Sequence, residues 1–290
     1  MATFRFSAFA DEYSENFDEQ IVGLKINGIS MIEIRGIDGT PIVEITEKKA
    51  KELKKKLDAA GIAVSAVGSP LGKVELTEDF EEYKKKIHHI CKLAEIFETK
   101  RVRVFSFYIP TGDDPDKYTD TVLDRMDQMI SIAEGYGLLL CIENEKRIFG
   151  DSPDRSLLLA ERFAGRVGLI FDPCNFVQCG FESFPDAFVK LKDKITYMHI
   201  KDCTKSGAVV LPGHGIGGIP EILAYLNRTR DDEIILTMEP HLMEFHGLKG
   251  LEKEGDRTDI KNQFATHAEA FAAAITAARL ALPNGAVEVR

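Results

Sequence analysis

The sequence lacks several features that define whole classes of protein. No run approaches the roughly 20 apolar residues that a membrane helix needs, and the amino terminus has no cationic segment followed by an apolar core, as a secretory signal would. The five cysteines are an odd number without CxxC or zinc-finger spacing, which argues against a disulfide framework. These absences predict a cytoplasmic protein that does not associate with a membrane.

An excess of basic residues is also absent. The 37 Lys and Arg residues against 47 Asp and Glu residues give a net charge of −10, which repels a phosphate backbone, so no nucleic-acid partner is expected. The composition, 44% hydrophobic and 29% charged over 290 residues, is that of an ordinary soluble globular protein. No linker or low-complexity segment divides the chain, and we expect residues 1–290 to form a single domain.

Two periodicities alternate along the chain. Short apolar or β-branched runs predict eight strands, and amphipathic stretches between them predict helices. The predicted strands are 4–9, 31–34, 63–67, 102–107, 138–142, 167–171, 195–200 and 234–238. The predicted helix ends are Asn16, Thr46 and Thr77 as N-caps, Ser152 before Pro153, and Gly28 and Gly61 after the last turns.

This alternation predicts the fold class. Eight βα units in 290 residues leave about 36 residues for each, close to the size of a (β/α)8 barrel. A doubly wound sheet would need a glycine-rich fingerprint directly after the first strand, but Ala-Asp-Glu-Tyr-Ser follows there. We therefore predict an α/β protein, a (β/α)8 TIM barrel.

Four consecutive predicted strands in the second half end at a residue that can bind a metal ion. These residues are Glu143, Asp172, His199 and Glu239, spaced 27 to 40 residues apart, or about one βα unit. The carboxyl ends of barrel strands meet at one face, so the four side chains should converge. Three carboxylates and one imidazole suit one divalent cation, Mn²⁺ first, with Mg²⁺, Co²⁺ or Zn²⁺ also acceptable. Each acidic residue taken alone could instead be a helix cap.

The strand-end motifs I-E-N, F-D-P-x-N, H-I-K-D and M-E-P resemble those of the xylose isomerase-like TIM barrel superfamily. The segments I-E-I-R at 32–35 and S-A-V-G-S-P-L-G-K at 65–73 extend the resemblance over nearly the whole chain. The superfamily includes sugar phosphate isomerases and epimerases, dehydratases of inosose or dehydroshikimate type, and apurinic endonuclease relatives. The resemblance implies that Glu143, Asp172, His199 and Glu239 bind the metal, and that Glu143 and Glu239 are also the catalytic acid/base pair.

The resemblance and the residue chemistry together predict an enzyme of carbohydrate metabolism. The expected reaction is isomerisation or epimerisation of a ketose or ketose phosphate, by removal of a proton next to a carbonyl through a metal-stabilised enediolate. A dehydratase of an inosose or dehydroshikimate and a non-catalytic sugar-binding barrel remain as alternatives. An endonuclease is disfavoured by the negative charge and by early strand ends without histidines. The expected partner is a small sugar or sugar phosphate, and a homo-oligomer stays open.

Five further residues are predicted to contact the substrate: Glu33, Asn175, Lys201, His214 and His241. Four of them have a structural alternative, since Asn175 and Lys201 could serve as loop caps, His241 could be an exposed loop residue, and Glu33 could pair with Arg35 inside the barrel.

Two loops complete the predicted mouth of the barrel. Gly213, Gly215 and Gly218 form a formal GxGxxG, too late in the chain for a dinucleotide site but similar to an anion-binding nest, which would suit a sugar phosphate near His214. Residues 241–259 form a connection of unusual length, either a lid over the substrate or a subunit contact.

Overall fold

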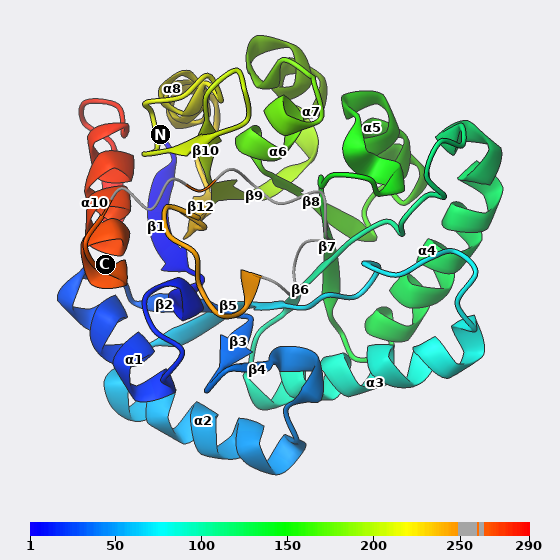
Figure 1. The fold of residues 1–290 in the computed structure, drawn as a ribbon, viewed down its shortest axis with the longest axis horizontal. Helices are drawn as coiled ribbons and strands as arrows, with labels where there is room; N and C mark the ends of the chain where they lie inside the picture. Colours follow the sequence, from blue (N-terminus) through cyan, green and yellow to red (C-terminus); the bar gives the residue numbers. More distant parts are fainter. Residues whose placement is uncertain (249–259, 261–263) are drawn as a thin grey trace.

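The computed structural model describes residues 1–248, 260 and 264–290. Eight parallel strands surround a common axis, as seen along that axis in Figure 1, and the predicted (β/α)8 TIM barrel is confirmed. The strands are β1 (Thr3–Ala8), β2 (Met31–Ile34), β5 (Ala63–Gly68), β6 (Arg101–Val104), β7 (Leu139–Glu143), β8 (Val167–Phe171), β9 (Ile195–Ile200) and β12 (Glu233–Met238). All eight predicted strands are present. The last three residues of the predicted strand 102–107 leave the ladder, because the N–H groups of Phe105 and Phe107 donate to the carbonyls of Leu71 and Gly72.

Helices cover the outside of the barrel between successive strands (Figure 1). They are α1 (Phe17–Ile26), α2 (Glu47–Ala60), α3 (Phe80–Ile96), α4 (Thr119–Glu134), α5 (Pro153–Arg162), α6 (Pro173–Gln178), α7 (Phe188–Leu191), α8 (Ile219–Thr229) and α10 (His267–Leu280). The predicted caps Asn16, Thr46 and Ser152 are confirmed, since each side chain accepts a backbone N–H of the first turn. Thr77 is wrong as a cap, because α3 begins later and Asp79 accepts from its first turn.

The parallel ladder runs without interruption from β2 through β5, β6, β7, β8, β9 and β12 to β1. A short last strand, β13 (Val287–Val289), pairs with residues 3–5 of β1 on the edge away from β12. The sequence analysis did not predict β13. β13 pairs with residues 3–5 on that edge of β1. Strands β1 and β2 contact each other on the same side but form no ladder.

The interior of the barrel is filled by side chains. Ala66, Cys141, Ile170, Tyr197 and Ile235 come from five different strands and form a buried cluster inside the barrel. A larger apolar cluster packs the outer faces of the strands against the helices. The two clusters make the barrel a rigid support for the residues at its mouth.

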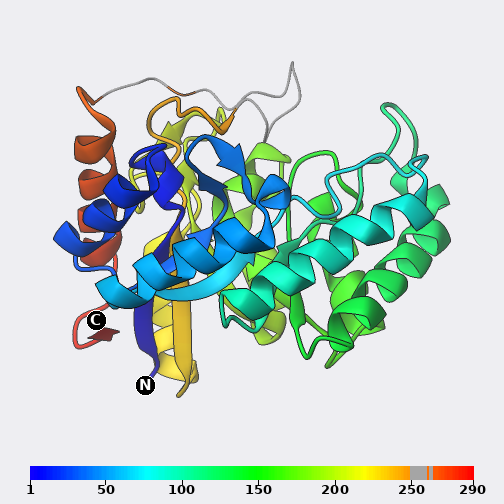
Figure 2. The same ribbon diagram turned by 90° about the horizontal axis from the view of Figure 1, so that it is seen from below.

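The carboxyl ends of the strands lie together at the mouth, which is at the top in Figure 2. Two antiparallel hairpins stand at this end: β3 (Gly36–Ile37) with β4 (Thr40–Pro41), and β10 (Asp202–Cys203) with β11 (Val209–Val210). Most of the predicted lid, residues 249–259, lies outside the described residues, so its role stays a prediction.

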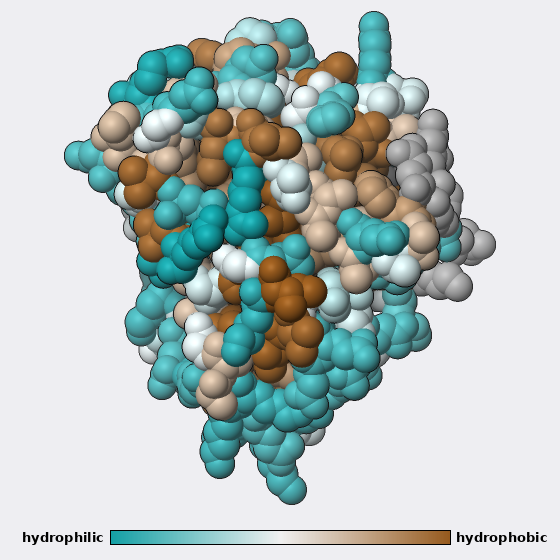
Figure 3. Space-filling view, turned by 90° about the vertical axis from the view of Figure 1, so that its left-hand side faces the viewer, coloured by the Kyte–Doolittle hydropathy of each residue, from teal (hydrophilic) through white to brown (hydrophobic). Residues whose placement is uncertain are grey.

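The side of the molecule where α1 and α10 lie carries apolar side chains among charged ones (Figure 3). Val22 and Ile26 of α1, Leu280 of α10 and Val287 of β13 are exposed hydrophobic residues of these elements. The oligomeric state stays a prediction. Among the described helices, none is long and apolar enough to cross a membrane.

Candidate metal and substrate site

The four residues at the ends of neighbouring strands come together at the mouth of the barrel. Glu143 ends β7, Asp172 follows β8, His199 lies in β9 and Glu239 follows β12. All four are buried, and one ligand atom from each lies within 4.8 Å of the others. Two ligands on opposite sides of an ion with bonds of 2.1–2.2 Å would be about 4.4 Å apart. The donors therefore fit one divalent cation with little movement.

Asp172 combines the two interpretations that the sequence left open. Its Oδ1 accepts the N–H of Asn175 at 2.9 Å and caps α6. Its Oδ2 is buried and accepts no hydrogen bond, and the Lys201 Nζ lies 3.0 Å away as an ion pair. Oδ1 thus fixes the Asp172 side chain as a helix cap, and Oδ2 is the oxygen that faces a positive charge.

His199 lies between two glutamates. Its Nδ1 is 2.9 Å from Glu143 Oε1, and its Nε2 is 3.2 Å from Glu33 Oε2. Burial alone lowers the pKa of His199, but the two carboxylates outweigh burial and raise the pKa well above its ordinary value. Because Nδ1 faces the cluster and Nε2 faces Glu33, a cation bound at Nδ1 would replace a proton while Nε2–H keeps its partner.

Glu33 contacts the ring nitrogen of His199 that faces away from Glu143. It is fully buried, and its oxygens also accept from Tyr197 (3.1 Å) and Thr237 (2.9 Å). These contacts suit a residue that orients His199. The prediction that Glu33 also contacts the substrate stays a prediction.

Glu239 faces cations on both of its oxygens. Arg35 Nη1 donates to Oε1 at 2.8 Å, and Lys201 Nζ donates to Oε2 at 3.4 Å. Burial opposes ionisation, but Lys201, His199 and His241 outweigh it and hold the pKa of Glu239 well below its ordinary value. By contrast, burial together with Glu239 and Glu143 raises the pKa of Asp172 to about 7, although Lys201 opposes the shift. This crowding of carboxylates favours a bound cation.

Glu143 and Asn175 are tied to the neighbouring strands. Arg103 of β6 donates to Glu143 Oε2 at 3.3 Å, and Asn175 Nδ2 donates to Glu143 Oε1 at 3.4 Å and to the Asn144 carbonyl at 2.9 Å. Asn144 exchanges two hydrogen bonds of 2.9 Å with the backbone of Asp172. Among the described residues, the buried Oδ1 of Asn175 has no hydrogen-bond partner. The prediction that Asn175 contacts the substrate stays a prediction.

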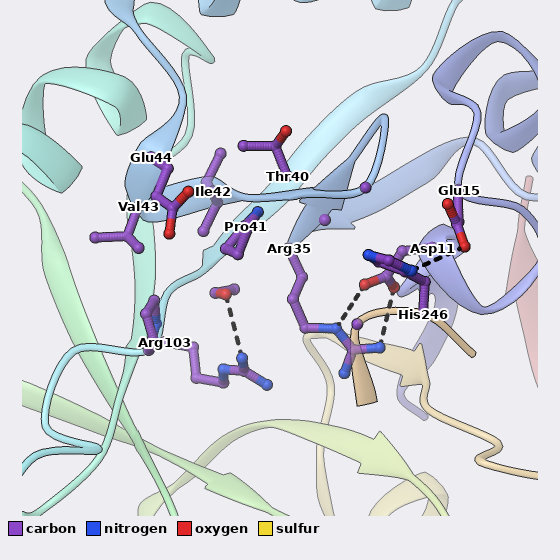
Figure 4. A pocket seen from close by; sticks show the side chains of 15 residues that line it. Asp11, Glu15, Arg35, Thr40, Pro41, Ile42, Val43, Glu44, Arg103 and His246 are labelled. Atoms are coloured by element: carbon purple, nitrogen blue, oxygen red, sulfur yellow. Dashed lines mark hydrogen bonds and ion pairs between the residues drawn. The ribbon is translucent and has the colours of Figure 1, made fainter. Parts of the chain in front are cut away.

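A cavity of about 340 Å³ adjoins the cluster on the β2, β5 and β6 side of the mouth. Figure 4 shows Arg35 and Arg103 side by side at its floor, with Arg35 paired to Asp11. The same two arginines contact Glu239 and Glu143, so they join the cavity to the ligand cluster. Pro41 of β4 and Ile42, the residue that follows this strand, give the opposite wall an apolar character.

The glycine-rich loop folds around the carboxylate of an aspartate from the same chain. The carboxylate of Asp202 accepts the N–H groups of Gly213, Gly215 and Gly217 at 2.9, 3.0 and 2.9 Å. An internal carboxylate thus uses the N–H groups of Gly213 and Gly215, and the predicted phosphate nest of Gly213, Gly215 and Gly218 stays a prediction. His214 is exposed, and among the described residues no hydrogen bond or ion pair connects its ring to the ligand cluster.

The remaining predicted residues, Lys201 and His241, both lie next to Glu239 of the four-residue ligand cluster. Each is buried, and each lies within 3.5 Å of a Glu239 oxygen. The prediction that they also contact substrate is not tested by these contacts.

The profile of the xylose isomerase-like TIM barrel family matches residues 24–266. The chain belongs to the xylose isomerase-like TIM barrel family. The resemblance found in the strand-end motifs is thereby confirmed. Among curated proteins, no match to the sequence is found.

Solved structures of this fold superpose over nearly the full chain. A probable 3-DHS dehydratase, AsbF from Bacillus anthracis, has 15% identity and a TM-score of 0.70, over 95% of this chain and 98% of that one. D-psicose 3-epimerase from Clostridium cellulolyticum H10 has 14% identity and a TM-score of 0.71, over 96% and 99%. The IolI protein with a bound zinc atom has 16% identity and a TM-score of 0.71, over 97% and 98%. At such identities the likeness shows the shared fold.

Three charged residues next to the ligand cluster were not among the predicted site residues. Asp11 and Glu12 follow β1, and Arg103 lies in β6. The rule applied to the later strand ends would have found Asp11 and Glu12, since both come within three residues of the end of the first apolar run. Arg103 alternates with buried valines in R-V-R-V, a pattern that does not distinguish a charge inside the barrel from one outside.

Proposed function

We propose that this protein is a divalent-metal-dependent isomerase or epimerase of a ketose or ketose phosphate. The observation that carries the proposal is the convergence of Glu143, Asp172, His199 and Glu239 beside a cavity of about 340 Å³. A divalent cation held by these residues, with Mn²⁺ as our first choice, would stabilise negative charge on the carbonyl and hydroxyl oxygens of a bound sugar. The proton on the adjacent carbon would then become removable.

Glu143 and Glu239 are the proposed acid/base pair. They belong to β7 and to the end of β12, with β8 and β9 between them, so their carboxylates approach the site from different sides. One carboxylate can take a proton from one face of a sugar while the other returns it on the opposite face. Positioned groups of this kind contribute about 10²- to 10⁴-fold in rate.

The surroundings of the cluster suit a polyhydroxylated substrate. The buried Oδ1 of Asn175 and the ring of His241 offer polar atoms without partners, and Arg35 and Arg103 line the adjoining cavity. Because N–H groups of the glycine loop already donate to the Asp202 carboxylate, we favour a free ketose over a ketose phosphate as the substrate. An inosose or dehydroshikimate dehydratase would use the same proton removal and remains the second candidate, in keeping with a dehydratase of this fold.

The deciding experiment is solvent deuterium incorporation into a panel of ketoses, ketose phosphates and inososes, with Mn²⁺ present. Incorporation with formation of an epimer or an aldose supports the proposal. Loss of water from the substrate would instead show that the protein is a dehydratase. The variants Asp172→Ala and His199→Ala should fold, lose most of the bound metal and show no incorporation. Metal-loaded protein that binds a sugar but exchanges no proton would be a non-catalytic barrel.

A further inference from the structure

A second cluster of metal-binding side chains adjoins the first. Glu12, Glu239 and His241 each place one ligand atom within 4.8 Å of the others, and all three are buried. Glu12 follows β1, whereas Glu239 and His241 follow β12, which is paired with β1. The cluster therefore lies on the side of Glu239 away from β8, outside the four-residue centre.

The ring of His241 packs against Phe245 but makes no hydrogen bond with any described residue. Its side chain is 5% exposed. Its Nε2 lies 3.5 Å from Glu12 Oε1 and 3.5 Å from Glu239 Oε1. These separations are long for hydrogen bonds, but two donors at about 2.1 Å from one tetrahedral ion are about 3.4 Å apart. The imidazole and the two carboxylates are thus spaced as ligands of one ion.

The backbone holds His241 in this position. Its φ of 45° is unusual for a residue other than glycine, and its N–H donates to Glu12 Oε2 at 2.7 Å. One Glu12 oxygen therefore fixes the His241 backbone, while the other faces the His241 ring. These contacts fix the orientation of Glu12 and His241 relative to each other.

Carboxylates outnumber the cations around the cluster, and Arg35 already donates to the Oε1 atoms of Glu12 and Glu239 that face His241. Arg35 donates through Nε and Nη2 to both oxygens of Asp11, at 3.0 Å each, and through its remaining donors reaches Glu12 (3.3 Å) and Glu239 (2.8 Å). Three buried carboxylates thus share one guanidinium. The Lys201 ammonium, 3.4 Å from Glu239, lies on the other oxygen of that carboxylate.

The two oxygens of Glu239 point into different clusters. Oε2 lies 3.4 Å from His199 Nδ1, in the first centre, and Oε1 lies 3.5 Å from His241 Nε2, in the second. We propose that Glu12, Glu239 and His241 bind a second divalent cation, of the class that accepts imidazole and carboxylate together (Zn²⁺, Mn²⁺ or Co²⁺), with Glu239 bridging the two ions. This second site goes beyond the proposed function, which needs one ion.

The test is the metal stoichiometry of the full chain. Protein stripped with a chelator is loaded with Mn²⁺, desalted and analysed for metal per chain, and its EPR spectrum is recorded. We expect two ions per chain in the parent protein, with the exchange coupling of a carboxylate-bridged pair. His241→Ala should bind one ion and lose the coupling, and Glu12→Gln, which keeps only a neutral oxygen ligand, should bind the second ion more weakly and lose it on desalting. His246→Ala, an exposed histidine paired with Glu15 in the same segment, is the matched control and should keep two.

Each outcome separates this proposal from the proposed function. One ion in the parent protein, lost in Asp172→Ala and kept in His241→Ala, overturns the second site and leaves the first intact. Two ions that persist in both His241→Ala and Glu12→Gln also overturn it. Glu12→Gln preserves side-chain volume and the acceptor for the His241 N–H, so it keeps the test valid if His241→Ala does not fold, as judged by circular dichroism.

Discussion

The carboxylate of Glu33 lies 3.2 Å from Nε2 of His199, the ring nitrogen opposite the one that faces Glu143. A metal-ligating histidine commonly donates its second ring N–H to a carboxylate, which fixes the tautomer and makes the ligand more basic. This contact gives Glu33, from the second strand of the barrel, an indirect role in a centre built on its fifth to eighth strands, β7, β8, β9 and β12.

Glu33→Gln should therefore weaken Mn²⁺ binding without removing a ligand. Replacing such a supporting carboxylate typically lowers metal affinity about 10- to 100-fold, and isothermal titration of the stripped protein measures the change. Glu233→Gln, at the exposed start of β12 and paired with Arg5, is the control and should bind Mn²⁺ like the parent. An unchanged affinity in Glu33→Gln would mean that His199 does not bind the ion through Nδ1.

Mn²⁺ affinity should rise with pH across the neutral range. Despite burial, Glu143 and Glu33 raise the pKa of His199 well above its ordinary value, and burial with two neighbouring glutamates raises the pKa of Asp172 to about 7. Both groups hold protons that a cation must displace, so acid competes with the metal. Titrations at several pH values, in buffers of different ionisation enthalpy, should show net proton release. Affinity independent of pH would contradict this protonation of the free site.

The four-residue centre could be predicted because each of its members closes an apolar strand. Parallel strands of one barrel place such residues at one face, whatever the loops between them do. Glu143, Asp172, His199 and Glu239 needed only correct strand positions, and the eight runs are clear in the sequence.

Contacts that depend on side-chain direction could not be predicted in the same way. Strand position puts Glu33 inside the barrel but does not show that its carboxylate meets His199. The glycine loop looked like a free anion site, because the sequence does not show that Asp202 folds back onto it from the β10 hairpin. Thr77 and Asp79 are both good capping residues, and the hydrogen bonds of the first turn of α3 select Asp79.

Asp202→Ala should destabilise the protein substantially. It removes the acceptor for three glycine N–H groups, and an unpaired buried donor costs about 1–3 kcal/mol, so we expect a loss of about 2–4 kcal/mol in urea unfolding after the loop relaxes. Asp193→Ala, exposed and paired with Lys192, should change stability little. In the parent protein, inorganic phosphate should leave the amide resonances of Gly213, Gly215 and Gly217 unchanged. Phosphate-dependent shifts there would restore the loop as an anion site.

Gly215→Ala tests the same contact from the other side. A Cβ at this position would collide with the Asp202 carboxylate and with the Cys203 carbonyl, and the carbonyl belongs to the backbone and cannot rotate away. We expect a loss of stability comparable to that of Asp202→Ala, again by urea unfolding. A neutral effect would show that the loop has another arrangement in solution.

The two glutamates of the metal centre should separate binding from turnover. Glutamine is nearly isosteric with glutamate and keeps a carbonyl oxygen for the metal, but it cannot accept the substrate proton. Glu143→Gln and Glu239→Gln should therefore retain measurable Mn²⁺ and sugar binding while turnover falls about 10²- to 10⁴-fold. Glu233→Gln again serves as the control, because it lies at the opposite end of the strand that leads to Glu239.

Proton exchange would then distinguish the roles of the two glutamates. If they act on opposite faces of an epimerised carbon, each variant loses proton transfer on one face only. One variant should still wash a substrate proton into deuterated solvent without completing inversion, and mass spectrometry of recovered substrate measures this exchange. Near-normal turnover in either variant would refute the two-glutamate mechanism. The base would then have to be sought at His241, whose ring lies 3.5 Å from Glu239 and has no hydrogen-bond partner among the described residues.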